Sequence, residues 1–256
     1  MTNPIDRLSK LINQPDSWNF VGAERFYAGI DLGTYKTIAI IIDETGMPLA
    51  ARMRRTEIAR SGLIVDYVGA LNTTRELMEE MRKHCPVPIE QGATSFPPQT
   101  EYANLKTTTH ILEGVGLEVL NVLDEPTAAN QVLKIENGAI VDVGGGTTGI
   151  AVIKEGEVIY TNDEATGGVH LSLVLAGHHK ISYEEAEEIK IDRRRNQEVL
   201  SVVRPVIDAA CIQRDQPVAE LRRPLGLLHR RPEPAGLGQD LGVAGHLGEQ
   251  PLALGS

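Results

Sequence analysis

Two stretches decide the fold: Gly29-Ile-Asp-Leu-Gly-Thr34 and Val141-Asp-Val-Gly-Gly-Gly-Thr-Thr148. Each follows an apolar, β-branched run, places an aspartate near the end of that run, and turns on glycine before a second β-run. Glycine permits positive φ angles and a close backbone approach to an anion, and successive amide groups in such a turn form a concave anion site. The pair therefore predicts two phosphate-binding turns, although either stretch alone is typical of an ordinary β-hairpin.

Two common kinds of phosphate loop are excluded. The chain contains no GxxxxGK[ST] motif, and neither turn opens a helix as a dinucleotide-binding GxGxxG does. The aspartates Asp31 and Asp142 instead suggest a hydrated cation, because Mg²⁺ keeps much of its water shell and a carboxylate can hold that water.

The order of predicted elements occurs twice around the turns. In the first half we expect strands at 27–31, 37–43, 48–53, 92–96 and 118–123, and helices at 66–82, 101–113 and 126–134. In the second half we expect strands at 139–143, 149–154 and 157–161, then helices from about Gly168, from Ser182 and over 202–208. This repetition predicts an α/β fold made of two related halves.

Composition narrows the class of protein. The chain has 35 acidic against 25 basic residues and a formal net charge of −10, which argues against a nucleic-acid partner. No apolar run approaches the roughly 20 residues that span a bilayer, and no signal-peptide pattern precedes the first strand. We therefore expect a cytoplasmic protein with no membrane partner. Residues 3–13 predict an amphipathic helix that is either a surface appendage or a docking helix.

Further motifs lie between and after the two turns. Together with the turns, these motifs resemble the actin/Hsp70/MreB superfamily. Asp124-Glu-Pro-Thr-Ala-Ala129 is similar to the Hsp70 connecting segment. Within that superfamily, Ala93-Thr-Ser-Phe-Pro-Pro98, Gly144-Gly-Gly-Thr-Thr-Gly-Ile-Ala151 and Asp163-Glu-Ala-Thr-Gly-Gly168 resemble the EutJ family of ethanolamine utilisation.

The resemblance implies a fold, a division of the chain and a ligand. The implied fold is actin-like (ribonuclease H-like), with two related α/β domains around a nucleotide cleft that takes ATP or ADP with Mg²⁺. The implied parts are an N-terminal helix and linker (1–25), domain I (26–124), an incomplete domain II (125–208) and an irregular tail (209–256).

The resemblance also implies roles for individual residues. Asp31, Glu125 and Asp142 are the implied catalytic residues: the aspartates hold Mg²⁺ through water, and Glu125 orients the attacking water. Without the resemblance, Glu125 reads as a helix-start carboxylate favoured by the helix dipole. The residues implied to contact phosphate or to lie under the nucleotide are Gly33, Thr34, Gly144, Gly145, Gly146, Thr147, Thr148, Gly167 and Gly168.

One charged pair, Glu187 and Lys190, has two possible interpretations, and the basic residues near the first turn match no known phosphate ligand. Glu187 and Lys190 match a pair that contacts ribose and adenine in the superfamily, but a solvated salt pair three residues apart fits equally well. For Lys36 we expect solvent exposure, because its register matches no phosphate ligand. No arginine of the nearby set Arg52, Arg54 and Arg55 matches one either.

The implied function is that of an ATP-dependent chaperone, reactivation or assembly factor in ethanolamine utilisation, with slow ATP turnover. Ethanolamine-catabolism enzymes or shell proteins of a bacterial microcompartment are the implied partners, with a cytoplasmic or microcompartment-associated location. Two alternatives stay open: a small-metabolite kinase of the same fold, and a non-hydrolysing actin-like structural or adaptor protein.

The sequence changes character from about Ala209. The stretch has no Lys, no aromatic residue and only one Ile, and no helical or strand period is sustained. This composition indicates a frameshifted reading frame or a low-complexity tail. It predicts an incomplete adenosine side and weak ATP binding. A single-base insertion or deletion near codon 209 would identify the frameshift.

Overall fold

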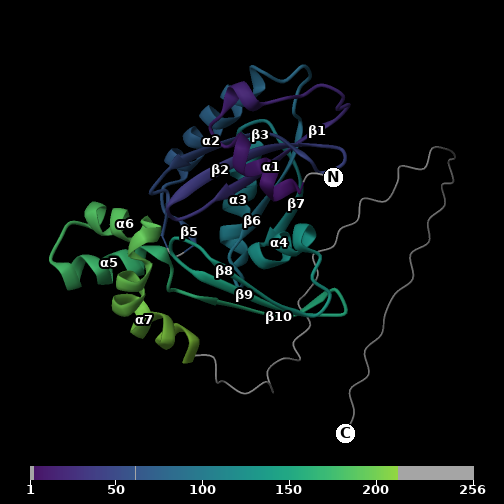
Figure 1. Ribbon diagram of the computed structural model, residues 1–256. Helices are drawn as coiled ribbons and strands as arrows, with labels where there is room; N and C mark the ends of the chain where they lie inside the picture. Colours follow the sequence, from purple (N-terminus) through teal and green to yellow (C-terminus); the bar gives the residue numbers. More distant parts are fainter. Residues whose placement is uncertain (1–2, 61, 213–256) are drawn as a thin grey trace, which may run out of the picture. The chain divides into compact units, whose positions relative to one another are not determined.

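The structure, a computed structural model, describes residues 3–60 and 62–212 (Figure 1). The expected irregular tail therefore lies outside the described residues from 213 onward, and helix α7 occupies 209–212. Within the described part of the chain, no helix is long and apolar enough to cross a membrane.

A five-stranded sheet forms the first half, in the order β3-β2-β1-β6-β7. Its strands are β1 (Phe26–Leu32), β2 (Lys36–Asp43), β3 (Pro48–Arg55), β6 (Gln91–Phe96) and β7 (Glu118–Asp124). The first three form an antiparallel meander, whereas β6 and β7 run parallel to β1. All five strands were predicted from their apolar and β-branched residues. A small hairpin of β4 (Ala59–Arg60) and β5 (Leu63–Ile64) was not predicted.

 Gly62, which directly precedes β5, donates its amide to the hydroxyl of Thr34 in the first glycine turn.

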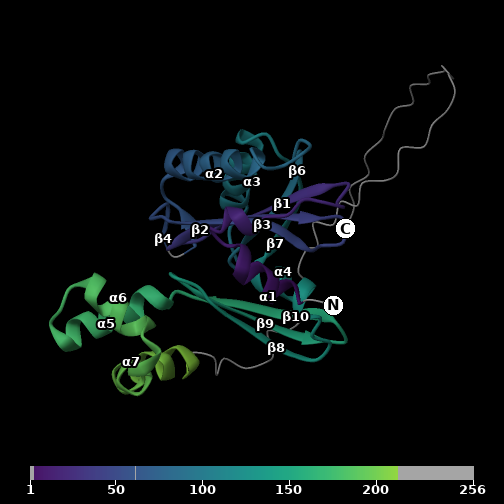
Figure 2. The ribbon, with the colours of Figure 1, turned by 45° about the horizontal axis from the view of Figure 1, so that its top comes forward.

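Helices α2 (Tyr67–Arg82) and α3 (Tyr102–Gly114) cover one face of this sheet (Figure 2). The Asp66 side chain accepts a hydrogen bond from the Gly69 amide and so caps α2 at the position where the sequence predicts the helix to begin. Buried side chains from the sheet and both helices form the main hydrophobic core, which includes Ile41, Leu77 and Met78. The core fixes which face of each strand points inward.

The opposite face of the sheet presents the polar residues at the end of β1. Burial alternates along β1, so Asp31 points away from the core that Ile30 and Leu32 enter. Asp31 pairs with Ile38 of β2, and Lys36 lies two residues earlier on that strand. Because side chains repeat every two residues along a strand, Lys36 and Asp31 share one face.

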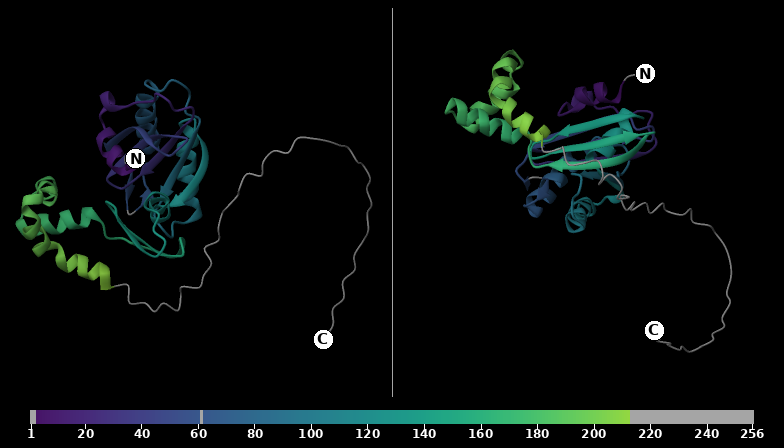
Figure 3. Two further views of the ribbon diagram at one scale, coloured as in Figure 1. Left: turned by 45° about the vertical axis from the view of Figure 1, so that its right-hand side comes forward. Right: turned by 90° about the horizontal axis from the view of Figure 1, so that it is seen from below.

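A three-stranded antiparallel sheet forms the second half, in the order β10-β9-β8 (Figure 3). Its strands are β8 (Gly138–Val143), β9 (Thr148–Lys154) and β10 (Glu157–Glu164). Helix α4 (Glu125–Leu133) contacts strands of both sheets. The strand–turn–strand–strand unit of the first half is thus repeated, as predicted.

Three helices follow the second sheet and pack on one another: α5 (Gly168–His179), α6 (Tyr183–Ile191) and α7 (Asn196–Ile212). Helix α6 begins where the sequence predicts it, with a capping box formed by Ser182 and Glu185. Helix α7 begins earlier than the expected range 202–208, because a 3-10 turn at Arg193–Arg195 leads directly into it.

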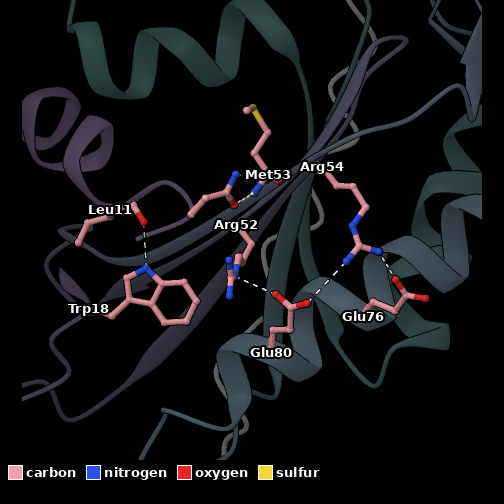
Figure 4. Close-up of polar contacts among 8 residues, drawn as sticks. Leu11, Trp18, Arg52, Met53, Arg54, Glu76 and Glu80 are labelled. Carbon is pink, nitrogen blue, oxygen red and sulfur yellow. Dashed lines mark hydrogen bonds and ion pairs between the residues drawn. The ribbon is translucent and has the colours of Figure 1, made fainter. Parts of the chain in front are cut away.

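The N-terminal segment packs against the edge of the first sheet. Helix α1 (Pro4–Leu11), capped by Asn3, contacts β3, and a 3-10 turn at Pro15–Ser17 follows it. The Asn13 side chain donates to the Met53 carbonyl and accepts from the Met53 amide. The Trp18 indole donates to the Leu11 carbonyl (Figure 4). The segment is therefore docked on its own sheet rather than being a free appendage.

Candidate functional site

A cavity of about 940 Å³ contains most of the residues singled out from the sequence. Its lining includes the two glycine turns, the first residue of α4 and residues of α5 and α6. This volume lies within the range of small-molecule sites, roughly 300–1,000 Å³. The sequence-predicted residues that line it are Asp31, Gly33, Thr34, Glu125, Asp142, Gly144, Gly145, Gly146, Thr147, Gly168, Glu187 and Lys190.

The two glycine turns have the same backbone hydrogen bonding. The Gly33 amide donates to the Lys36 carbonyl at 3.0 Å, and the Gly144 amide donates to the Thr147 carbonyl at 2.9 Å. In each turn the next two amides, at 34–35 and 145–146, donate no hydrogen bond within the described residues. Unpaired amides in consecutive turn residues are suited to bind an anion.

The turns also touch each other. A Cβ atom on Gly145 would lie 2.8 Å from the Cβ of Tyr35, and one on Gly146 would lie 2.6 Å from the Oγ1 of Thr34. Real Cβ atoms do not approach so closely, so a side chain at either position would have to displace the other turn. The hydroxyl of Thr34 in addition accepts a hydrogen bond from the Gly62 amide at 3.3 Å.

Four carboxyl groups near the turns have a raised pKa. Burial is the main cause, and it raises the pKa of Glu125 to about 8 and that of Asp31 to about 6. Burial also raises the pKa of Asp142 and brings that of Asp163 to about 6. The charge of Lys36 opposes the rise at Asp31 and Asp142. A cation near these groups would favour their ionised forms.

Asp163 was not singled out as a site residue from the sequence. It lies near the end of β10, and its Oδ1 is buried without a hydrogen-bond partner among the described residues. The side chain of Thr147 opposes the rise in the pKa of this carboxyl group. A signal was present, since Asp163 precedes Gly167-Gly168 at a strand end, much as Asp31 and Asp142 precede glycine turns.

The residues present fit a hydrated Mg²⁺ rather than a directly ligated one. Within the described ranges, no three His, Cys, Asp or Glu side chains lie close enough to hold a metal ion between them. The carboxylates are nevertheless hard oxygen donors, and the orphaned Oδ1 of Asp163 can accept a hydrogen bond from water. Mg²⁺ keeps several water ligands and is suited to such an arrangement.

Glu187 and Lys190 form a buried network rather than a solvated salt pair. The Lys190 ammonium lies 2.7 Å from Glu187 Oε2 and donates to the Gly168 carbonyl at 2.9 Å. The Ser172 hydroxyl donates to the same Glu187 oxygen. Of the two interpretations left open by the sequence, the solvated salt pair is therefore wrong, because the pair ties α6 to the start of α5. Both residues still line the cavity.

Two of the implied ligand residues lie behind the second turn and not in the cavity lining. The Thr148 side chain is buried, and its hydroxyl donates to the Thr166 carbonyl. A Cβ on Gly167 would lie 2.6 Å from the Gly145 carbonyl oxygen. The next amides, of Gly168 and Val169, donate to the Gly144 and Gly145 carbonyls at 2.9 Å each. The start of α5 thus supports the turn from behind.

Of the three arginines and Lys36, two residues line the cavity and two do not. Arg52 and Arg54 point to the helix face, where they pair with Glu80 and Glu76 of α2 (Figure 4). Arg55 lines the cavity with its guanidinium 5.4 Å from the Tyr35 ring centre. Lys36 is exposed, as expected, yet it also lines the cavity, because β2 presents it on the face that carries Asp31.

Comparison with known proteins relates most of the chain to one group. The ethanolamine utilization protein EutJ of Salmonella typhimurium is 41% identical over 208 residues, which cover 81% of this chain and 72% of that protein. EutJ of Escherichia coli is 41% identical over 182 residues, 71% of this chain and 64% of that protein. The chain thus spans about two thirds of the curated relatives it matches. Residues 126–214 match the family model "Type IV pilus assembly protein PilM".

Solved structures also resemble this chain. The crystal structure of EutJ from Carboxydothermus hydrogenoformans matches with a TM-score of 0.72 and 40% identity, covering 83% of this chain and 79% of that one. MreB 5 of Spiroplasma citri matches with a TM-score of 0.56 and 14% identity, covering 77% of this chain and 81% of that one. The second likeness shows a shared fold alone.

Proposed function

The chain belongs to the EutJ family, and from this premise we propose that it binds Mg·ATP in the cavity and serves ethanolamine utilisation as an ATP-dependent chaperone, reactivation or assembly factor. Its fold is that of the actin/Hsp70-type ATPases. One observation carries the proposal: two turns from different sheets meet, and each offers two unpaired backbone amides to the same cavity. Polyphosphate is the ligand class that such paired anion sites suit.

The carboxylates would hold the cation that accompanies the phosphates. Asp31 and Asp142 lie at the ends of equivalent strands, one at each turn, and are placed to hold Mg²⁺ through water. Mg²⁺ supplies charge neutralisation on the phosphates when bound. Asp163, with one oxygen free of any described partner, can hold a further water.

Glu125 is the proposed residue that orients water for hydrolysis. As the first residue of α4 it also lies at a helix start, so the two interpretations of this residue are compatible. With its pKa raised to about 8, Glu125 is mostly protonated at neutral pH in the chain alone. A protonated carboxyl cannot accept a proton from water. Hydrolysis therefore depends on the cation, which lowers this pKa.

Calorimetric titration tests the binding step. We expect Mg·ATP to bind, and Asp142→Asn to weaken the binding of Mg·ATP by about tenfold or more, since a charge-assisted contact is lost. Asp16→Asn, which changes an exposed aspartate in the N-terminal 3-10 turn, is the matched control and should leave affinity unchanged. Absence of heat with wild-type protein at millimolar Mg·ATP, confirmed by an unchanged melting temperature, would refute nucleotide binding.

A second candidate is an adaptor that binds a partner without hydrolysing ATP. The match of residues 126–214 to the model of a type IV pilus assembly protein favours it, because that name describes an assembly component. Ethanolamine-catabolism enzymes and microcompartment shell proteins are the proposed partners in either case. Pull-down with ATP, ADP and no nucleotide, combined with a phosphate-release assay, separates the two: an adaptor retains its partner without releasing phosphate.

A further inference from the structure

We propose that Lys36 is the residue with which the cavity distinguishes a nucleoside triphosphate from a diphosphate, its ammonium binding the terminal phosphate. The inference rests on the proposed function, and it names a residue that the sequence placed in solvent. Lys36 lies at the end of the first glycine turn. The Lys36 carbonyl closes this turn by accepting a hydrogen bond from the Gly33 amide.

The strand register brings the Lys36 side chain to the ligand side of the turn. Lys36 is the first residue of β2 and stands opposite Arg55 of β3, while Asp31 stands opposite Ile38. Positions 36 and 38 share a face, which is the face turned away from the core. Two residues span roughly 7 Å along a strand, so the lysine side chain can reach a group bound beside Asp31.

Lys36 interacts with Asp31 and Asp142 through its charge alone, whereas the other basic residues of the cavity are in direct contact with a neighbour. Lys190 is held by Glu187 and by the Gly168 carbonyl. Arg55 lies over the Tyr35 ring. The Lys36 side chain makes no ion pair, hydrogen bond or ring contact within the described residues, although it lines the cavity.

The charge of Lys36 acts at both turns. It opposes the raised pKa of Asp31 on the first sheet and that of Asp142 on the second. A terminal phosphate gripped between the two turns would meet the same positive field. That phosphate adds negative charge to a region already occupied by carboxylates, so a single ammonium there favours the longer polyphosphate.

Calorimetry with Mg·ATP and Mg·ADP on four proteins tests the assignment: wild type, Lys36→Met, Lys36→Arg and the control Lys154→Met. Lys154 lies at the exposed end of β9, outside the cavity. We expect Lys36→Met to weaken Mg·ATP about 10- to 100-fold and Mg·ADP by less than about threefold, because one charge-assisted bond to the terminal phosphate is lost. Lys36→Arg should retain most of the preference, and the control should match wild type.

A second pair of probes, Mg·tripolyphosphate and Mg·pyrophosphate, separates this inference from the proposed function. Selective loss of tripolyphosphate in Lys36→Met supports the role of Lys36 even if neither nucleotide binds, in which case only the nucleotide function fails. Equal weakening of long and short ligands, or no weakening of either, overturns the assignment. Failure of wild type to bind all four ligands overturns both.

Discussion

The two halves of the molecule use the same turn but cover it differently. The first turn belongs to a five-stranded sheet with a large buried core and with its β3 edge covered by the N-terminal segment. The second belongs to a three-stranded sheet whose edge strand β8 leaves Val141 53% and Val143 60% exposed. The backbone hydrogen bonding of the turns is nevertheless equivalent.

The comparison teaches that the turn geometry is local, whereas its support comes from packing. A strand, a glycine turn and an antiparallel strand suffice to make the turn. In the second half the support comes from α5, whose first amides donate to the turn carbonyls. Helices α5, α6 and α7 enclose a smaller cluster, in which Leu175 and Val203 are buried.

The largest expected effect of the different packing in the two halves is on the cost of removing a buried side chain from each core. Leu77→Ala in the main core should lower the free energy of unfolding by about 3–5 kcal/mol, and Leu175→Ala in the smaller cluster by about 2–3 kcal/mol. Both side chains are almost completely buried, at 1% and 0% exposure, so their surroundings and not their burial differ. A small cluster can collapse around the lost side chain more easily than a large sheet core.

Urea unfolding combined with hydrogen exchange measures the two variants, since exchange reports each half separately. Leu120→Ala, at an exposed position of β7, controls for the substitution itself. An equal or larger cost for Leu175→Ala would mean that the second half is packed as firmly as the first, and the comparison would then lose its physical basis.

Most of the fold was predictable because its signals are local. The apolar alternation of the strands, the Asp66 cap and the Ser182–Glu185 capping box all depend on residues close in sequence, and the structure contains each of them. The small β4–β5 hairpin was missed, since two-residue strands carry no detectable period. The start of α7 was missed because its first turn is mostly polar and follows the charged 3-10 turn Arg193–Arg195, so the apolar period begins only later.

Part of the site could not be predicted, because it depends on which residues the tertiary structure brings together. The aspartates at the two turns followed from the motif. That Glu187 and Lys190 are not a solvated pair follows only from their contacts to Ser172 and Gly168, and their contact with a nucleotide stays a prediction. The cavity-lining position of Lys36 depends on the register of β2 against β1, which a sequence pattern does not specify.

The next effect concerns the contact between the turns. Gly146→Ala should cost about 1–3 kcal/mol, because its Cβ would lie 2.6 Å from the Thr34 hydroxyl and must push the turns apart. Gly29→Ala is the matched control, since a Cβ there meets nothing within 4 Å. Thermal unfolding of both variants measures the difference.

A double variant decides whether the contact is the cause. Thr34→Ala removes the hydroxyl, so adding it to Gly146→Ala should recover about 0.5–1 kcal/mol relative to the sum of the single effects. Strict additivity would show that Gly146 is needed for its own turn and that the halves do not support each other at this point.

The smallest expected effect is on the pH dependence of stability, through the carboxyl groups that the two halves bring close together. The pKa of Glu125 is raised from its ordinary value of 4.5 to about 8, chiefly by burial and then by Asp31, with Asp142 and Asp163 contributing from the second sheet. The folded state therefore holds this proton more tightly than the unfolded state. Stability from this group is present at low pH and is lost as the pH rises from 4.5 to 8.

Glu125→Gln should remove that loss of stability. Between pH 5 and pH 8.5, the free energy of unfolding of the variant should therefore rise by about 1–2 kcal/mol relative to that of the wild type, after allowance for solvent screening in an open cavity. Urea unfolding at several pH values measures the gain, and Glu79→Gln on the exposed side of α2 is the control. Saturating Mg²⁺ should reduce the gain, because a cation neutralises the same carboxylates without a proton. A gain that is independent of pH would mean that the carboxylates of the two sheets do not repel one another through Glu125, and the halves would then be coupled by their turns alone.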